Sequence, residues 1–171
     1  MKYVKLSFFL LVFLLISCKN NSQESQAPVK HVDLVELNKV WVKKNRQTII
    51  GYLNRQGIKM TETPTGLWFQ KISEGNGVEV KQDKLIEISY DIFLLDGTLC
   101  YSSLEEGNKT FLVGKGGVES GLEEGILLLH KGDSVHFLIP PYLAHGNTGD
   151  DKKIPPRAIL DYRIKVVDVL E

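Results

Sequence analysis

A ten-residue stretch with strong two-residue alternation constrains the fold of this chain more than any other feature. Successive side chains of an extended strand point to opposite faces, so residues 85–94 have one apolar face. The Asp96-Gly97 pair that follows is typical of a hairpin turn, and residues 99–102 supply the return strand. An antiparallel sheet with one covered face is therefore predicted. The apolar face comprises Ile86, Ile88, Tyr90, Ile92 and Leu94.

One short helix is predicted among the strands. Ser120 and Glu123 have the S-x-x-E spacing of a capping box, and Gly132 follows at the expected stop. The helix has an apolar stripe that must lie on a sheet: Leu122, Ile126 and Leu129. The predicted fold class is α+β, with a curled antiparallel sheet packed on one short helix and preceded by an N-terminal helix. The further strands are predicted at residues 67–72, 110–113, 135–139 and 159–170.

The beginning of the chain has the pattern of an export signal. Lys2 and Lys5 precede the apolar residues 6–16, which are too few for a span of roughly 20 residues across a bilayer. The segment ends in Leu15-Ile16-Ser17-Cys18, which resembles the lipobox of bacterial lipoproteins, where the cysteine is lipidated. A secretory peptide that ends near a cysteine by chance is the alternative. The lipobox predicts attachment of lipid at Cys18.

Four segments are expected in the chain. Residues 1–17 form the predicted lipoprotein signal peptide, and residues 18–31 are a polar, flexible tether. Residues 32–65 are a helical segment, and residues 66–171 form the main domain. The apolar stripe of the helix is predicted to pack on that domain, and pairing of two protomers is the alternative.

The balance of charge and the histidine spacing exclude several function classes. The chain has 21 basic and 21 acidic residues, so no excess of positive charge is available for nucleic acid. Four histidines show no metal-ligand spacing, and Asp150-Asp151 is followed by two lysines, so we expect no metal site. Residues 114–119 lack the third glycine of a dinucleotide-binding loop. No cofactor is expected.

An ordered series of short motifs across residues 66–171 carries the strongest functional indication. The motifs are Tyr90, Asp96-Gly97, Ser102-Ser103, Phe111, Val113-Gly114, Val118, Gly121-Leu122-Glu123-Glu124-Gly125, Lys131-Gly132-Asp133, Ile139-Pro140, Ala144-His145-Gly146, Ile154-Pro155-Pro156 and Leu160-Asp161-Tyr162. This series resembles the FKBP family of peptidyl-prolyl cis–trans isomerases. The lipobox with the preceding helix is similar to the FKBP-type lipoproteins of Bacteroidetes, including one associated with gliding motility.

The resemblance assigns roles to nine residues of the domain. His145 stands where the family usually has a tyrosine that binds a substrate carbonyl, and Glu119 stands where an apolar residue is common. Cys100 and Tyr101 replace a pocket phenylalanine and its adjacent aspartate, and Leu122 replaces the tryptophan at the pocket floor. The implied catalytic residues are Tyr90, Phe111, Leu122, His145, Ile154 and Tyr162, and the implied substrate-binding residues are Val118, Cys100 and Tyr101.

Structural alternatives exist for the same residues. Tyr90, Phe111 and Tyr162 are also the aromatic residues expected in the core of any β-rich domain. His145 is either a substrate hydrogen-bond donor or a solvated loop residue. Cys100 is expected to be a small buried hydrophobe rather than a catalytic thiol.

Two functions follow from the resemblance. The first is a lipid-anchored peptidyl-prolyl isomerase of the bacterial cell envelope that faces the periplasm and acts on proline-containing polypeptides. The second is a binding module that has lost catalysis and scaffolds a membrane assembly. The replacements at Cys100, Tyr101 and His145 motivate the second. The family also leaves open a macrolide-type ligand.

Overall fold

The computed structural model describes residues 33–170, which include a 23-residue helix, α2 (Leu34–Gln56), and the whole sheet domain. Contacts divide the chain into residues 1–33 and 34–171, and only the second unit is described below. The predicted signal peptide, Cys18 and the predicted tether lie outside the described residues.

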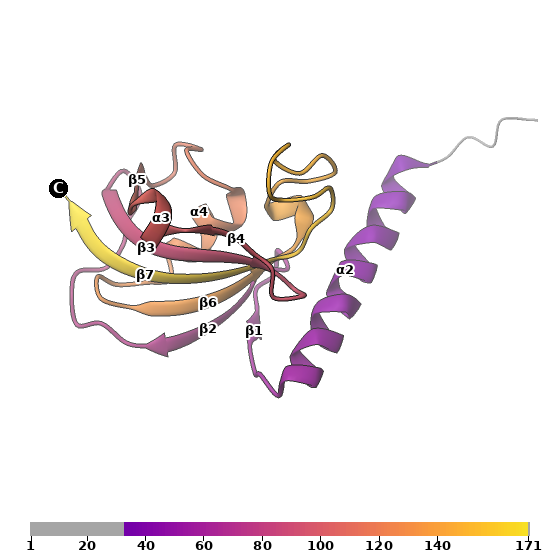
Figure 1. The fold of residues 1–171 in the computed structure, drawn as a ribbon, viewed down its shortest axis with the longest axis horizontal. Coiled ribbons are helices and arrows are strands. Elements are labelled where there is room, and N and C mark those ends of the chain that lie inside the picture. The colour runs from indigo at the N-terminus through magenta and orange to yellow at the C-terminus, as the bar shows by residue number, and fades with distance from the viewer. Residues whose placement is uncertain (1–32, 171) are drawn as a thin grey trace, which may run out of the picture. The chain divides into compact units, whose positions relative to one another are not determined.

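A seven-stranded antiparallel sheet forms the body of the second unit (Figure 1). Two short α-helices and one 3₁₀ helix interrupt the strand order: α3 (Ser103–Glu106), α4 (Ser120–Ile126) and η1 (Pro141–Leu143). The predicted α+β class is confirmed. The strands are β1 (Thr61–Glu62), β2 (Trp68–Ser73), β3 (Leu85–Leu94), β4 (Leu99–Ser102), β5 (Lys109–Leu112), β6 (Ser134–Ile139) and β7 (Leu160–Leu170).

Strand β3 lies inside the sheet and has neighbours on both sides. It pairs with β7 along its whole length, while its other edge is shared by β5 at one end and β4 at the other. The helical turn α3 connects β4 to β5, so this edge is a single path with a turn in the middle. The alternation predicted for residues 85–94 is seen in the burial of every second residue, although Leu94 is only half-buried.

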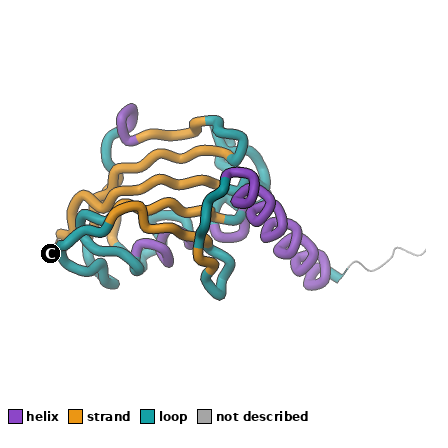
Figure 2. Tube along the Cα trace, turned by 90° about the horizontal axis from the view of Figure 1, so that it is seen from below, coloured by secondary structure: helices purple, strands orange, loops and turns teal. Residues whose placement is uncertain are grey.

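Helix α4 covers one face of the curved sheet (Figure 2). It approaches β6 very closely, because a Cβ added at Gly125 would lie 2.7 Å from Cζ of Phe137. Gly121 has the same role one turn earlier, where an added Cβ would lie 2.5 Å from a methyl carbon of Ile139. Only glycine permits this spacing, and it lets Leu122 and Ile126 enter the main core completely.

Helix α2 packs against the sheet only through its C-terminal half. Ile49, Tyr52 and Leu53 are buried there against a second apolar cluster from three strand and loop positions: Trp68, Leu138 and Ile159. The predicted packing on the domain therefore holds for this half. In the N-terminal half, Leu34, Leu37 and Val40 of the predicted stripe are exposed.

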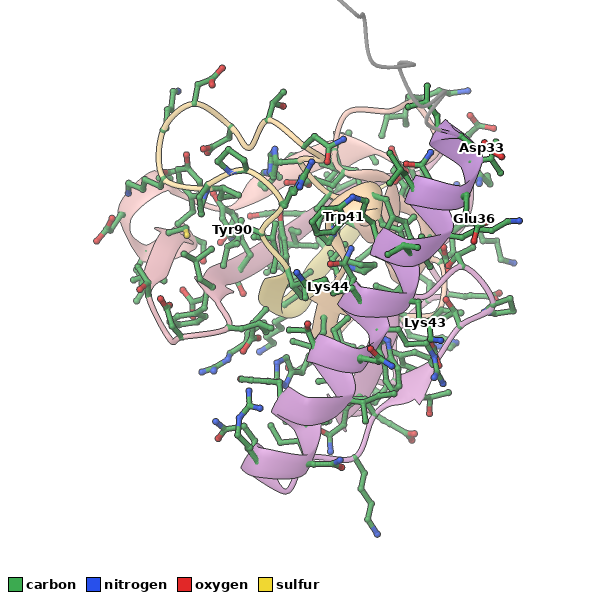
Figure 3. The ribbon with its side chains drawn as sticks, turned by 90° about the vertical axis from the view of Figure 1, so that its right-hand side faces the viewer. Asp33, Glu36, Trp41, Lys43, Lys44 and Tyr90 are labelled. Carbon is green, nitrogen blue, oxygen red and sulfur yellow. The ribbon has the colours of Figure 1, made fainter. Side chains whose placement is uncertain are left out.

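Near the middle of α2, one aromatic side chain contacts the domain (Figure 3). The guanidinium of Arg157 lies 4.2 Å from the ring centroid of Trp41, and Lys44 lies 5.0 Å from it. Arg157 belongs to the loop that precedes β7, and its Nε donates to Asn147 at 3.1 Å. The helix therefore supports the 145–158 loop from outside.

Three local predictions about the elements are wrong. Ser120 does not form a capping box: its hydroxyl donates to the carbonyl of Leu143, and Glu123 accepts instead from the backbone of Gly114 and Gly116. Tertiary partners thus outcompete the local cap. The helix also ends at Ile126, before Leu129 and Gly132, because the chain tightens there into turns in which Leu128 and Leu129 donate to carbonyls three residues earlier.

Asp161 is the third correction. The alternation of β7 places it on the polar, solvated face, but it is 1% exposed because α2 covers that part of the sheet. The short elements β1, α3 and η1 carry no periodicity and were not predicted.

Candidate active site

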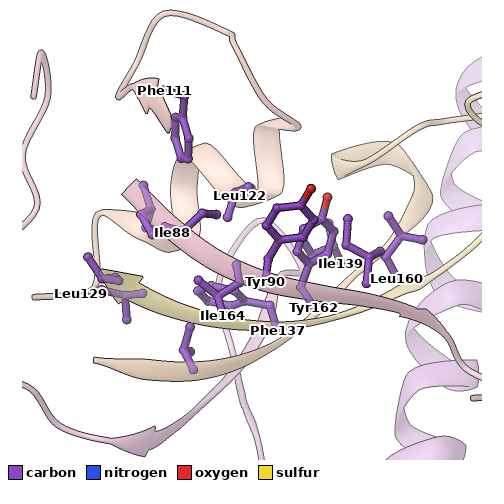
Figure 4. Close-up of a cluster of buried hydrophobic side chains, with 14 of the residues drawn as sticks. Ile88, Tyr90, Phe111, Leu122, Leu129, Phe137, Ile139, Leu160, Tyr162 and Ile164 are labelled. Carbon is purple, nitrogen blue, oxygen red and sulfur yellow. The ribbon is translucent and has the colours of Figure 1, made fainter. Parts of the chain in front are cut away.

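Two tyrosines from neighbouring strands form the centre of the candidate site. Tyr90 on β3 and Tyr162 on β7 extend from the face that α4 covers, and their hydroxyls point in the same direction (Figure 4). The Tyr162 hydroxyl donates to Oε1 of Glu119 at 2.6 Å, and the Tyr90 hydroxyl donates to Oε2 of Glu106 at 3.3 Å. Both phenols are almost completely buried.

Burial is the main cause that raises the pKa of both phenols. The nearby carboxylates of Glu119 and Glu106 raise the pKa of Tyr162 and Tyr90 further, and the pKa of Tyr162 lies well above its usual value. At neutral pH both groups therefore keep their protons and act as hydrogen-bond donors.

Apolar side chains from four separate segments surround the tyrosines. Phe111 comes from β5, Leu122 from α4 and Ile154 from the loop before β7, and all three are buried in the same core cluster. Val118 is half-buried against that cluster. The structure thus brings together Tyr90, Phe111, Val118, Leu122, Ile154 and Tyr162, as the resemblance implies.

His145 and Glu119 close one side of this cluster. Nε2 of His145 lies 3.0 Å from Oε1 of Glu119, the same oxygen that accepts from Tyr162. Because a carboxylate can only accept, this nitrogen is the donor. The His145 side chain is 28% exposed and points into the site, which argues against the solvated-loop alternative.

Cys100 and Tyr101 lie at the edge of the cluster rather than at its centre. Cys100 is 1% exposed, its thiol contacts the carbonyl of Lys153 at 3.5 Å, and burial raises its pKa, as expected for an unreactive core residue. The hydroxyl of Tyr101 donates to Asp150, which also accepts from the backbone N–H of Ile154 at 2.8 Å. The pair ties the 147–154 loop to β4.

The Tyr101–Asp150 pair shifts the pKa of both partners. The hydrogen bond to Asp150 is the main cause that raises the pKa of Tyr101 to about 12. Burial raises the pKa of Asp150, but donation from Tyr101 and from two backbone N–H groups outweighs it and lowers the value to about 2. The ionised carboxylate thus holds the loop near neutral pH.

Among residues 33–170, no three His, Cys, Asp or Glu side chains gather as a metal site. In the same range, no helix combines the length and apolar character needed to cross a membrane. A groove of about 680 Å³ lies on the other face of the sheet, lined by outward-pointing Ser89, Asp91 and Lys165 among others.

Three carboxylates of the site had no role in the sequence interpretation. Glu106, Glu119 and Asp150 each accept a hydrogen bond from one tyrosine of the cluster. Only Glu119 gave a signal, since it occupies a position where the resemblance implies an apolar residue. Glu106 ends the short helix α3 and Asp150 lies in a loop, and their partner tyrosines are 16 and 49 positions away in sequence.

Comparison with known proteins gives a consistent picture. A family model described as FKBP-type peptidyl-prolyl cis-trans isomerase matches residues 77–167. A probable isomerase of this type, FkpA of Neisseria meningitidis, is 31% identical over 150 residues, which is 86% of this chain and 53% of the relative. A 22 kDa isomerase of this type from Escherichia coli is 31% identical over 68% of this chain and 55% of its own length. The chain spans about half the length of these curated relatives.

Solved structures agree with the sequence matches. The crystal structure of AtFKBP13 is similar with a TM-score of 0.63 and 30% identity, covering 65% of this chain and 98% of that chain. FkpA from Escherichia coli is similar with a TM-score of 0.65 and 27% identity, covering 80% of this chain and 63% of that chain. The second match covers a larger share of this chain than the first.

Proposed function

The chain belongs to the FKBP family of peptidyl-prolyl cis–trans isomerases, and on that premise we propose that it accelerates rotation about Xaa-Pro bonds. The substrates are proline-containing polypeptides of the bacterial cell envelope. The observation that carries the proposal is the buried aromatic and aliphatic cluster, with donors from Tyr90, Tyr162 and His145 at its edge.

The chemistry requires no nucleophile, metal or redox group. Conjugation of the peptide bond gives rotation a barrier of about 18–20 kcal/mol. The amide is twisted in the transition state and loses this conjugation, so a water-poor apolar site favours the transition state over the planar ground state. In this chain Phe111, Leu122 and Ile154 supply the apolar walls.

An exchange experiment on peptides tests this function. NMR exchange rates of Xaa-Pro peptides are measured without protease, with the full chain in detergent micelles. We expect acceleration that Tyr90→Ala abolishes and that Tyr162→Phe lowers about tenfold, the loss of roughly one buried hydrogen bond. Tyr142→Phe is the matched control, since Tyr142 is an exposed tyrosine outside the cluster.

The second candidate is a binding module without catalysis. Burial of the cluster favours the binding module, because Tyr162 is 1% exposed and its hydroxyl lies beneath Glu119 and His145. Such a module would hold a proline-containing segment within a membrane assembly, and the similarity to Bacteroidetes lipoproteins makes a gliding assembly the first to test. Binding of proline peptides with no acceleration for any Xaa would support this function and refute the isomerase.

Membrane attachment is the other part of the proposal. We expect lipid on Cys18, which places the domain on a tether in the envelope, facing the periplasm. Mass spectrometry of the mature protein should show loss of residues 1–17 and addition of a diacylglycerol group. Cys18→Ser should abolish both and move the protein out of the membrane fraction, and an unchanged mass and partition would refute the anchor.

The exposed part of α2 offers a surface for client contacts. Leu34, Val35, Leu37, Val40 and Val42 are all exposed large apolar side chains. This surface is the candidate for client binding outside the proline site, or for contact between two protomers. Analytical ultracentrifugation of the chain in detergent distinguishes the two, because only protomer pairing changes the oligomeric state.

A further inference from the structure

Glu119 places a charged group inside an otherwise apolar site. Its side chain is 10% exposed, and it lies directly after Val118 and before the first residue of α4. One carboxylate oxygen, Oε1, accepts from both Tyr162 and His145. These two hydrogen bonds hold the carboxylate at the border of the cluster.

The other oxygen of the same carboxylate is unsatisfied. Oε2 of Glu119 is buried and has no hydrogen-bond partner among the described residues. A buried acceptor without a partner costs free energy, and a charged acceptor costs more than a neutral one. A ligand that brings a donor to this oxygen gains that free energy back on binding.

The other charged groups near the site leave Oε2 of Glu119 without a partner. Glu106 and Asp150 lie on the hydroxyls of Tyr90 and Tyr101, so the tyrosines of the border all donate to carboxylates. The cations nearby, Lys109 and Lys153, lie over the outer faces of the same two rings at 5.3 and 5.0 Å. His145 contacts Oε1 of Glu119 and not Oε2.

We propose that Glu119 is a specificity-determining residue that makes the site favour Lys or Arg immediately before the proline and disfavour Asp or Glu there. The inference rests on the proposed function, since it assumes that the proline ring enters the cluster beside Val118. The ammonium or guanidinium of the preceding residue then donates to Oε2 of Glu119. An Asp or Glu before the proline would instead lie beside the carboxylate of Glu119, where little water screens the repulsion between the two negative charges.

A set of matched peptides tests the proposal. Tetrapeptides that differ only in Lys, Leu or Glu before proline are compared by kcat/KM in the exchange assay with the full chain in micelles. We expect the Lys peptide to exceed the Glu peptide at least tenfold, with the Leu peptide between them. In Glu119→Ile the Lys-to-Glu ratio should fall to about twofold or less, and Glu119→Asp should restore part of it.

The ratio of kcat/KM for the Lys peptide to kcat/KM for the Glu peptide distinguishes a loss of recognition from a defect in folding. A variant that merely distorts the site lowers kcat/KM for all three peptides by a similar factor and leaves the ratio unchanged. Glu124→Gln is the control, because Glu124 lies in α4, close to Glu119 in sequence, but accepts from Thr65 at 2.6 and 2.8 Å, outside the cluster. Its ratio should equal that of the unmodified chain.

Peptide binding keeps the proposal testable without catalysis. If no peptide is isomerised, the proposed isomerase function fails, and the Kd values of the Lys and Glu peptides are measured by NMR titration instead. A Lys preference that Glu119→Ile removes supports the role of Glu119. Equal Kd or kcat/KM values for the Lys and Glu peptides, or a ratio that persists in Glu119→Ile, would overturn it.

Discussion

The two faces of strand β6 are buried by different means. Phe137 and Ile139 point to the face covered by α4 and belong to the large core, whereas Leu138 points to the other face and packs under α2. β6 is therefore buried on both faces, although the strand belongs to an antiparallel sheet. The first face surrounds the candidate site, and the second attaches a helix.

Each face contains a buried tyrosine that donates to a carboxylate. On the α4 face, Tyr162 donates to Glu119, which also contacts a loop histidine. On the α2 face, the hydroxyl of Tyr52 lies 3.4 Å from Oδ2 of Asp161, and Nε2 of His136 lies 2.5 Å from Oδ1. The same kind of hydrogen-bonded pair thus lies beneath loops at the candidate site and beneath a long helix on the other face.

The largest expected effects come from truncating one side chain in each of the two apolar clusters, the main core and the cluster under α2. Phe137→Ala should lower the free energy of unfolding by about 3–5 kcal/mol, and Leu138→Ala by about 2–5 kcal/mol, because both side chains are fully buried. Only Phe137→Ala should also reduce kcat/KM, since it removes the support of α4. Urea unfolding and the exchange assay measure both quantities, and equal losses of activity would contradict the separation.

The buried charge under α2 should come next. Asp161→Ala removes the partner of His136 and Tyr52 and should cost roughly 3 kcal/mol of folding free energy. Asp161→Asn, which keeps one acceptor, should cost less. Thermal unfolding checks both variants. If Tyr52→Phe lowered the folding free energy as much as Asp161→Ala does, the hydroxyl of Tyr52 and not the charge of Asp161 would hold the helix.

Acid should release the loop at the border of the site through protonation of Asp150. The folded-state pKa of Asp150 is about 2, below its usual value of 3.8, so its stabilising contribution is complete above that usual value and is lost as the pH falls toward 2. Amide exchange at Ile154 should therefore rise in this window. Asp150→Asn should show fast exchange at every pH, while Asp151→Asn, the neighbouring control, should follow the unmodified chain.

The smallest effect concerns the contact between α2 and the loop. Trp41→Ala removes the stacking of Arg157 and should cost about 0.5–1 kcal/mol, the usual range for exposed cation–π pairs. A shift of Tm measures it. Lys43→Ala on the same helix, an exposed residue on another side, should leave Tm unchanged.

Much of the sheet could be predicted from local patterns. The bounds of β3 and β4 agree with the predicted residues 85–94 and 99–102, because alternation and a hairpin turn are local signals. The cap and length of α4 could not be predicted. Ser120 and Glu123 have partners in η1 and in the 114–116 loop, which are close only in the folded chain.

The sequence determined which residues are apolar and in what period, and therefore the α+β class and the longer strands, while the family resemblance implied the aromatic residues of the candidate site. Only the tertiary structure decided which carboxylate each tyrosine contacts and which face of β7 is solvated. Hydrogen-bond partners such as Tyr162 and Glu119 are 43 residues apart, and no local pattern encodes such a distance. The unsatisfied oxygen of Glu119 exists only because packing closes around it.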